Sequence, residues 1–80
     1  MEVMPRKPSK KFSESIGNAL GLNWNDIDFD QFHIGLGVET EHWETVDRNW
    51  YTIARIAVDH LLEFPDYYTH LIAMEKRLKA

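Results

Sequence analysis

The spacing of apolar residues constrains the fold more than any other feature of the sequence. Apolar residues recur every three or four positions over most of the chain, which is the period of an α-helix with one buried face. Three successive stripes have this spacing: Phe29, Phe32, Leu36 and Trp43; Trp50, Ala54, Ala57, Leu61 and Phe64; and Tyr67, Leu71, Met74 and Leu78. No segment alternates in the manner of a half-buried strand, so the pattern predicts an all-α protein.

Residues that favour helix ends place the boundaries of four helices. Ser13, Asp28 and Asp47 are suited to N-caps, and Gln31 would complete a capping box after Asp28. Gly21 suits the position just after a helix C-terminus. We expect helices at about residues 13–20, 29–42, 48–64 and 65–79. Because their connections are short, the longer helices should pack antiparallel as a small three- to four-helix bundle, with the first helix laid across them.

Charge divides the chain into two regions. Residues 1–11 hold four basic side chains against one acidic side chain, whereas residues 12–80 are acidic on balance, and the whole chain has a formal net charge of −4. We therefore expect a basic N-terminal arm and a single helical domain. The arm would lie on an acidic surface of its own or a neighbouring subunit, bind a polyanion, or serve only as a flexible solubilising terminus. Its candidate binding residues are Arg6, Lys7, Lys10 and Lys11.

Several classes of protein are disfavoured by composition. The chain has no cysteine, which excludes disulfides and thiolate metal sites and fits a reducing compartment. Its longest uninterrupted apolar run, Leu71 to Met74, is far shorter than the ~20 residues of a membrane span. The N-terminus lacks the apolar segment of a secretory signal. We expect a cytoplasmic protein that does not enter a membrane.

The expected helices are apolar on a second side as well. The residues of this second side are Ile34, Val38, Tyr51, Val58, Leu62, Tyr68 and Ile72. A bundle of this size cannot bury both sets, and apolar patches left in water usually mark interfaces. The pattern predicts a protein partner, either further copies of the chain in a homo-oligomer or a larger assembly. The alternative is that the arm and the first helix cover these residues.

Two pairs of polar residues on neighbouring helices are candidates for a metal site. Glu39 falls on the apolar side of its helix with His42 three residues later, and His60 with Glu63 repeats the pair in reverse. Helical bundles build sites for divalent transition metals from such pairs. In a tight hairpin, however, His42 and His60 would lie roughly 15 Å apart. A shared site would need steeply crossing helices or two subunits.

The other interpretation of these residues is structural. Glu39 would meet the last helix near Lys76, and His42 and His60 would complement helix C-termini. Gly35 would mark a point where another backbone crosses closely. His33 and His70 belong to no recognisable constellation and are expected at the surface.

Signals for catalysis or nucleic-acid binding are few. The chain has no glycine-rich phosphate loop or dinucleotide motif, and Ser13 and Ser15 have no histidine beside them in sequence. Nucleic-acid binding would depend on the arm alone, because the rest of the chain offers no basic face. The sequence therefore does not favour an enzyme or a nucleic-acid-binding protein.

Two strings of residues resemble a known pattern. They are Phe32-x-x-Gly35-Leu36-x-Val38-Glu39-x-Glu41-His42 and Ile56-Ala57-x-x-His60-Leu61-x-Glu63-x-Pro65-Asp66-Tyr67-Tyr68. Over about residues 15–75 the chain resembles a small uncharacterised family, a domain of unknown function found in bacterial and phage genomes. The resemblance implies a bacterial or phage origin and no known activity. It singles out a polar signature of Glu39, Glu41, His42, His60, Glu63 and Asp66.

Together these observations predict a non-enzymatic helical interaction or structural protein without a cofactor. It would act by oligomerisation or by docking on a larger partner, in a bacterial or phage-infected cell or in a virion. The alternative is a metal-binding helical domain that uses Glu39, His42, His60 and Glu63.

Overall fold

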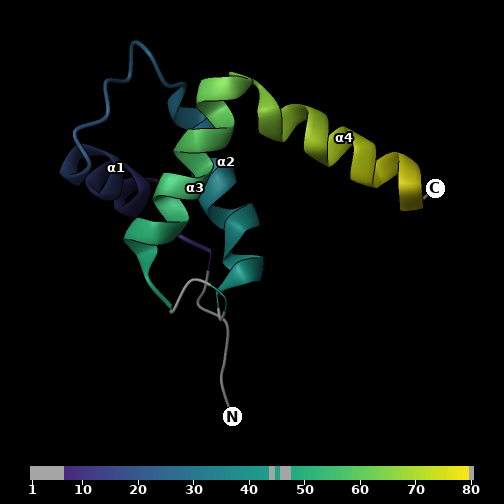
Figure 1. Cartoon of the computed structure of the whole chain (residues 1–80), viewed down its shortest axis with the longest axis horizontal. Coiled ribbons are helices and arrows are strands. Elements are labelled where there is room, and N and C mark those ends of the chain that lie inside the picture. Colours follow the sequence, from purple (N-terminus) through teal and green to yellow (C-terminus); the bar gives the residue numbers. More distant parts are fainter. Residues whose placement is uncertain (1–6, 44, 46–47, 80) are drawn as a thin grey trace.

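Residues 7–43, 45 and 48–79 are described by a computed structural model of the chain (Figure 1). In order, they form helices α1 (Lys10–Ala19), α2 (Phe29–Glu39), the short 3-10 helix η1 (Thr40–His42), α3 (Trp50–Glu63) and α4 (Tyr67–Lys79). No strand occurs within these ranges. The predicted all-α class is confirmed.

Helix α1 begins at Lys10, earlier than predicted, because a different serine caps it. The Ser9 side chain accepts a hydrogen bond from the Phe12 N–H at 3.1 Å. Ser13, the predicted cap, lies inside the helix and is fully buried. Both Ser9 and Ser13 are serine, so the preference for serine at an N-cap does not show which of the two caps the helix.

The C-terminal end of α1 follows the prediction. Gly21 has a positive φ of 76°, which a side chain would disfavour. The Leu22 N–H returns to the Gly17 carbonyl and the Gly21 N–H to the Asn18 carbonyl, both at 3.0 Å. This is the Schellman arrangement, in which the last carbonyls of a helix are satisfied by the chain that leaves it.

Helix α2 begins at the predicted cap, but Gln31 has a different role from the one expected. The Asp28 carboxylate accepts the Gln31 N–H at 2.9 Å. The Gln31 side chain does not complete a capping box; it crosses to α4, where its oxygen accepts the Tyr68 N–H at 3.1 Å and its nitrogen donates to the Thr69 hydroxyl at 2.7 Å. A residue near the start of α2 thus supplies the N-terminal capping of α4.

Helix α3 is capped by Asn49, whose side-chain oxygen accepts the N–H groups of Tyr51 and Thr52 at 2.9 and 3.3 Å. Asp47, the cap predicted from the sequence, lies outside the described residues. The helix therefore starts two residues later than expected, at Trp50.

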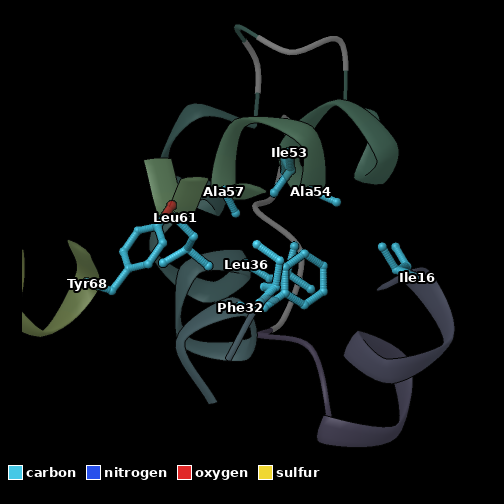
Figure 2. Packing of buried hydrophobic residues seen from close by; sticks show 9 residues of the cluster. Ile16, Phe32, Leu36, Ile53, Ala54, Ala57, Leu61 and Tyr68 are labelled. Carbon is cyan, nitrogen blue, oxygen red and sulfur yellow. The ribbon is translucent and has the colours of Figure 1, made fainter. Parts of the chain in front are cut away.

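The core lies between α2 and α3, which run antiparallel, with α1 across one side (Figures 1 and 2). Its buried apolar residues are Ile16, Ile27, Phe32, Leu36, Ile53, Ala54, Ala57, Leu61 and Tyr68. Five of these belong to the stripes predicted for α2 and α3. Helical period alone therefore located the buried faces of the two central helices.

Helix α4 diverges from the other helices, in contrast to the expected row of antiparallel neighbours. Its first turn is anchored by Tyr68, which is fully buried, whereas Met74 and Leu78 are 44% and 78% exposed. Figure 1 shows its C-terminal half extending away from the rest of the molecule. The predicted α4 stripe therefore remains largely open.

Candidate functional site

The most concentrated group of polar side chains surrounds a buried carboxylate. Glu39, the last residue of α2, is 5% exposed and accepts the Tyr68 hydroxyl at 2.7 Å through its Oε2. His60 Nδ1 of α3 lies 3.1 Å from the same oxygen. His42 Nε2 of η1 lies 3.9 Å from Oε1. We call Glu39, His42, His60 and Tyr68 the Glu39 cluster; it joins four helical elements at one point.

The position of Gly35 explains how Tyr68 reaches the carboxylate. Residues four apart lie one above the other on a helix, so Glu39 stands one turn beyond Gly35 on the same side of α2. The Tyr68 ring lies against Gly35, in space that a Cβ would occupy. Its hydroxyl then reaches the next turn. Gly35 was expected to admit another backbone; it admits the ring of a side chain instead.

Burial keeps the phenol of Tyr68 protonated. It raises the pKa of Tyr68 far above the ordinary value, and the hydrogen bond to the Glu39 carboxylate and the negative charge of that group act in the same direction. Tyr68 is therefore a neutral donor. The Tyr68 hydroxyl donates its proton to Glu39, so the Tyr68 oxygen can only accept from His60. His60 Nδ1 lies 3.2 Å from this oxygen, and as an N–H group it can donate to the Tyr68 oxygen and to Glu39 Oε2.

The Glu39 cluster satisfies its own hydrogen-bonding groups. His60 also stacks on Tyr67, with ring centroids 4.3 Å apart. Among the described residues, every buried side-chain nitrogen and oxygen has a hydrogen-bond partner. A buried carboxylate that accepts such bonds is stable in the fold, whereas an unpartnered one would be costly. The arrangement works as a polar link that holds α3 and α4 to the end of α2.

The structure brings together three of the four proposed metal ligands. The predicted separation of roughly 15 Å between His42 and His60 is wrong, since both rings contact one carboxylate. That prediction followed positions along the helix axes and left out the reach of the side chains. Glu63 is exposed and does not line the pocket of about 230 Å³ beside the cluster. Glu41 and Glu75 line that pocket instead.

No group of three or more His, Cys, Asp or Glu side chains in the described part of the chain is arranged to hold a metal ion. The structural alternative also needs correction. Glu39 meets α4 at Tyr68, near its start, and not near Lys76. His42 and His60 do lie in the last turns of η1 and α3, as predicted, and the His60 ring nitrogen also contacts the Glu39 carboxylate.

Two histidines expected to stand alone at the surface have partners. His33 is half-buried, and its Nδ1 lies 2.7 Å from the Ser13 hydroxyl, which joins α2 to α1. The sequence did not predict this pair, because Ser13 and His33 are 20 positions apart in the chain. Because Ser13 is fully buried, its hydroxyl is not accessible to a substrate. His70 is exposed and pairs with Asp66 at 2.8 Å.

The residues predicted to bind a partner lie in different environments. Ile34, Tyr51 and Leu62 are exposed, at 39%, 49% and 67%. Three others are half-buried: Val38, Val58 and Ile72. Tyr68 was placed on this second face, which is wrong, because it is part of the core.

The basic arm is described only in part. Lys7 and Pro8 line a groove with Ile34, Val38 and Ile72, so this portion of the arm lies beside the second apolar side. The exposed residues Lys10 and Lys11 form the first turn of α1. Arg6 lies outside the described residues.

An apolar groove lies along α4. It has a volume of about 470 Å³ and is lined by Phe64, Tyr67, His70, Leu71 and Met74. Phe64 is 60% exposed, and Leu78 continues the same stripe at 78%. We call Phe64, Tyr67, Leu71, Met74 and Leu78 the open α4 face. These residues were expected to pack inside the bundle. Tyr67 and Leu71 are half-buried and pack against the core, whereas the divergence of α4 leaves Phe64, Met74 and Leu78 exposed.

Comparison with protein families agrees with the resemblance seen in the sequence. A family profile described as a protein of unknown function, DUF5661, matches residues 13–77. The chain belongs to the DUF5661 family. Neither the curated proteins nor the solved structures gave a significant match. The DUF5661 match includes every residue of the Glu39 cluster and all of the open α4 face except Leu78. None of the described helices is both long and apolar enough to span a membrane.

Proposed function

We propose that this protein is a non-enzymatic helical interaction module that binds a protein partner through the open α4 face. The observation that carries the proposal is the exposure of Met74 and Leu78 on one side of the projecting helix α4, together with that of Phe64 at the C-cap of α3 just before it. Soluble monomers rarely leave contiguous apolar surface of this kind in water. A helix that presents apolar residues at intervals of three and four is a common unit of protein recognition.

The way in which α4 is held supports this role. Its start is fixed by Gln31 on one side and by the Glu39 cluster on the other. The apolar face is therefore presented on an element of defined position, so a partner has little conformational entropy to remove on binding. In this interpretation Glu39, His42 and His60 of the polar signature hold the interaction helix in place.

The proposed setting is the cytoplasm of a bacterial or phage-infected cell, or a virion. The resemblance of the sequence to a family of bacterial and phage genomes supports this setting. The absence of cysteine from the sequence is consistent with it.

A photoreactive amino acid at position 78 tests the proposal in cells that carry the gene. Leu78 is 78% exposed, so its replacement leaves the core intact. A matched control carries the same amino acid at Asp30, an exposed position of α2. We expect irradiation to give protein adducts from position 78 and not from position 30. Equal yields at both positions, or none at 78, would contradict the proposal.

A further inference from the structure

The residues of the open α4 face extend from Leu71 in both directions along the chain. Phe64, the C-cap of α3, stands seven residues before Leu71, and Leu78 stands seven residues after it; within α4, Tyr67 and Met74 stand four and three residues from Leu71. Intervals of three and four are the pattern with which helices pair along a seam. When two such helices run in opposite directions with Leu71 at the centre, Phe64 of each meets Leu78 of the other.

The shapes at the two ends of this face are complementary. Phe64, Tyr67 and Leu71 line the groove at the start of α4. Leu78, near the end of the helix, is the most exposed large apolar residue described. An antiparallel pair inserts the Leu78 of each copy into the groove of the other. The same contact then forms twice, as a two-fold axis requires.

The charges of α4 favour the same direction. Lys76, Arg77 and Lys79 form the basic last turn, whereas Asp66 stands at the start. Asp66 bonds to His70, which is seven residues from Arg77 and therefore on the same flank. In an antiparallel pair equal flanks meet, which brings Asp66 of one copy to Arg77 of the other. A parallel pair would instead place the basic turns together.

The body of the molecule leaves room for this contact. On a helical wheel Tyr68 and Met74 lie on opposite sides of Leu71, about 60° from it in each direction. Tyr68 enters the core, so the Met74 side is turned outward. The C-terminal half of α4 also stands clear of the other helices (Figure 1).

We propose that the occupant of the open α4 face is a second copy of this chain, and that two chains pair through antiparallel α4 helices about a two-fold axis near Leu71. This inference rests on the proposed function, because it names the partner of the same face.

Sedimentation of the purified full chain tests the stoichiometry. We expect a dimer whose dissociation constant rises at least about 100-fold in Leu78→Glu, because two buried leucines per dimer are replaced by charged groups. The substituted position is exposed in the single chain, so the helical content should not change. Asp30→Asn, at an exposed position of α2, serves as a control that retains the dimer.

Introduced cysteines test the direction and register, since the natural chain has none. A disulfide needs Cα atoms within about 7 Å. We expect Leu71→Cys to form a disulfide-linked dimer on mild oxidation, whereas the control Asp30→Cys does not. In a mixture of Phe64→Cys and Leu78→Cys chains, disulfides between the two kinds should exceed those within one kind. An excess within one kind would show a parallel pair and overturn the arrangement.

Charge exchange tests the flank contact. We expect Arg77→Glu to weaken the dimer about tenfold and the double variant Asp66→Lys/Arg77→Glu to recover most of that loss. Lys76→Glu makes the same change of charge on the far side of the helix and should have a smaller effect. Circular dichroism of each variant checks that α4 still forms, because Asp66 lies at its N-terminal end.

These experiments separate the pairing from the wider proposal. A monomer at high concentration, together with position-78 adducts of a mass other than two chains, would overturn the dimer and leave the interaction module. A monomer with no adducts at position 78 would overturn both. Adducts with the mass of two chains support both.

Discussion

The ring of Tyr68 occupies the space that a side chain at Gly35 would need. This relationship fixes where α4 meets α2, and it carries the Tyr68 hydroxyl to Glu39 one turn further along. Because Gly35 has no side chain, Tyr68 can form its buried hydrogen bond to Glu39, and α4 leaves the molecule from this point.

Replacement of Gly35 by alanine should destabilise the fold. In an ordinary helix interior the change would stabilise by about 1 kcal/mol, because alanine is the better helix former. Here the methyl group collides with the buried Tyr68 ring. We expect a net loss of about 1–3 kcal/mol in the free energy of unfolding, as for other overpacked cores, measured by denaturant titration.

Gly37→Ala is the matched control for this prediction. The nearest atom to a Cβ at Gly37 is a carbon of the Lys7 side chain at 3.7 Å, an ordinary contact. The same substitution two residues away should therefore leave stability unchanged or raise it by up to about 1 kcal/mol. Equal losses at both positions would show that the Tyr68 contact is not the cause.

Tyr68→Phe should reveal the contribution of the buried hydrogen bond. The variant keeps the ring against Gly35 but removes the donor to Glu39. The loss of one partner of a buried polar pair costs about 1–3 kcal/mol, more when the other group is charged. We expect a loss of this size on chemical unfolding. Tyr51→Phe, at a position that is 49% exposed, should cost much less.

The raised pKa of Tyr68 predicts a loss of stability in alkali. The unfolded chain releases the phenol proton above about pH 10, whereas the folded chain retains it. Above that pH the folded state binds more protons, so the free energy of unfolding falls as pH rises; below it this contribution is complete.

Ultraviolet titration of phenolate can follow this behaviour. Of the three tyrosines, Tyr68 should ionise only as the protein unfolds. Its replacement by phenylalanine should remove that late step and reduce the alkaline loss of stability. An early, reversible ionisation of all three in the folded protein would contradict the assignment.

Addition of divalent metal ions distinguishes the structural role of the Glu39 cluster from the alternative metal site. The Glu39 oxygens already accept from Tyr68 and contact two imidazoles. We therefore expect Zn²⁺, Mn²⁺ and Fe²⁺ to leave the melting temperature unchanged. A rise with added metal that disappears in His60→Ala would favour the metal site, because a ligand that binds only the folded state stabilises it.

The sequence predicted the central pair of helices because that information is local. Phe32 and Leu36 lie one turn apart, and the helical period places them on one face without reference to the rest of the chain. The C-terminal glycine of α1 was predicted for the same reason, since Gly21 relieves a conformation set by its own backbone.

The environment of α4 was not predictable in this way. The helical period placed Tyr68 beside the stripe of Tyr67 and Leu71, and assigned the stripe to the core. Which side of α4 turns inward is decided by the space at Gly35 and by the reach to Glu39, both far away in sequence. The contact between Ser13 and His33 was not predictable for the same reason, because the two residues are far apart in the sequence.

The assistance that Gln31 gives to the first turn of α4 has a consequence for the order of assembly. A helix of 13 residues is only marginally stable by itself in water, and the N–H of Tyr68 bonds to a side chain 37 positions earlier in the chain. We therefore expect α4 to form fully only after α2 has packed against α3. If α4 binds a partner as proposed, a half-made or damaged chain would be unable to bind it, and only molecules that have finished folding would associate.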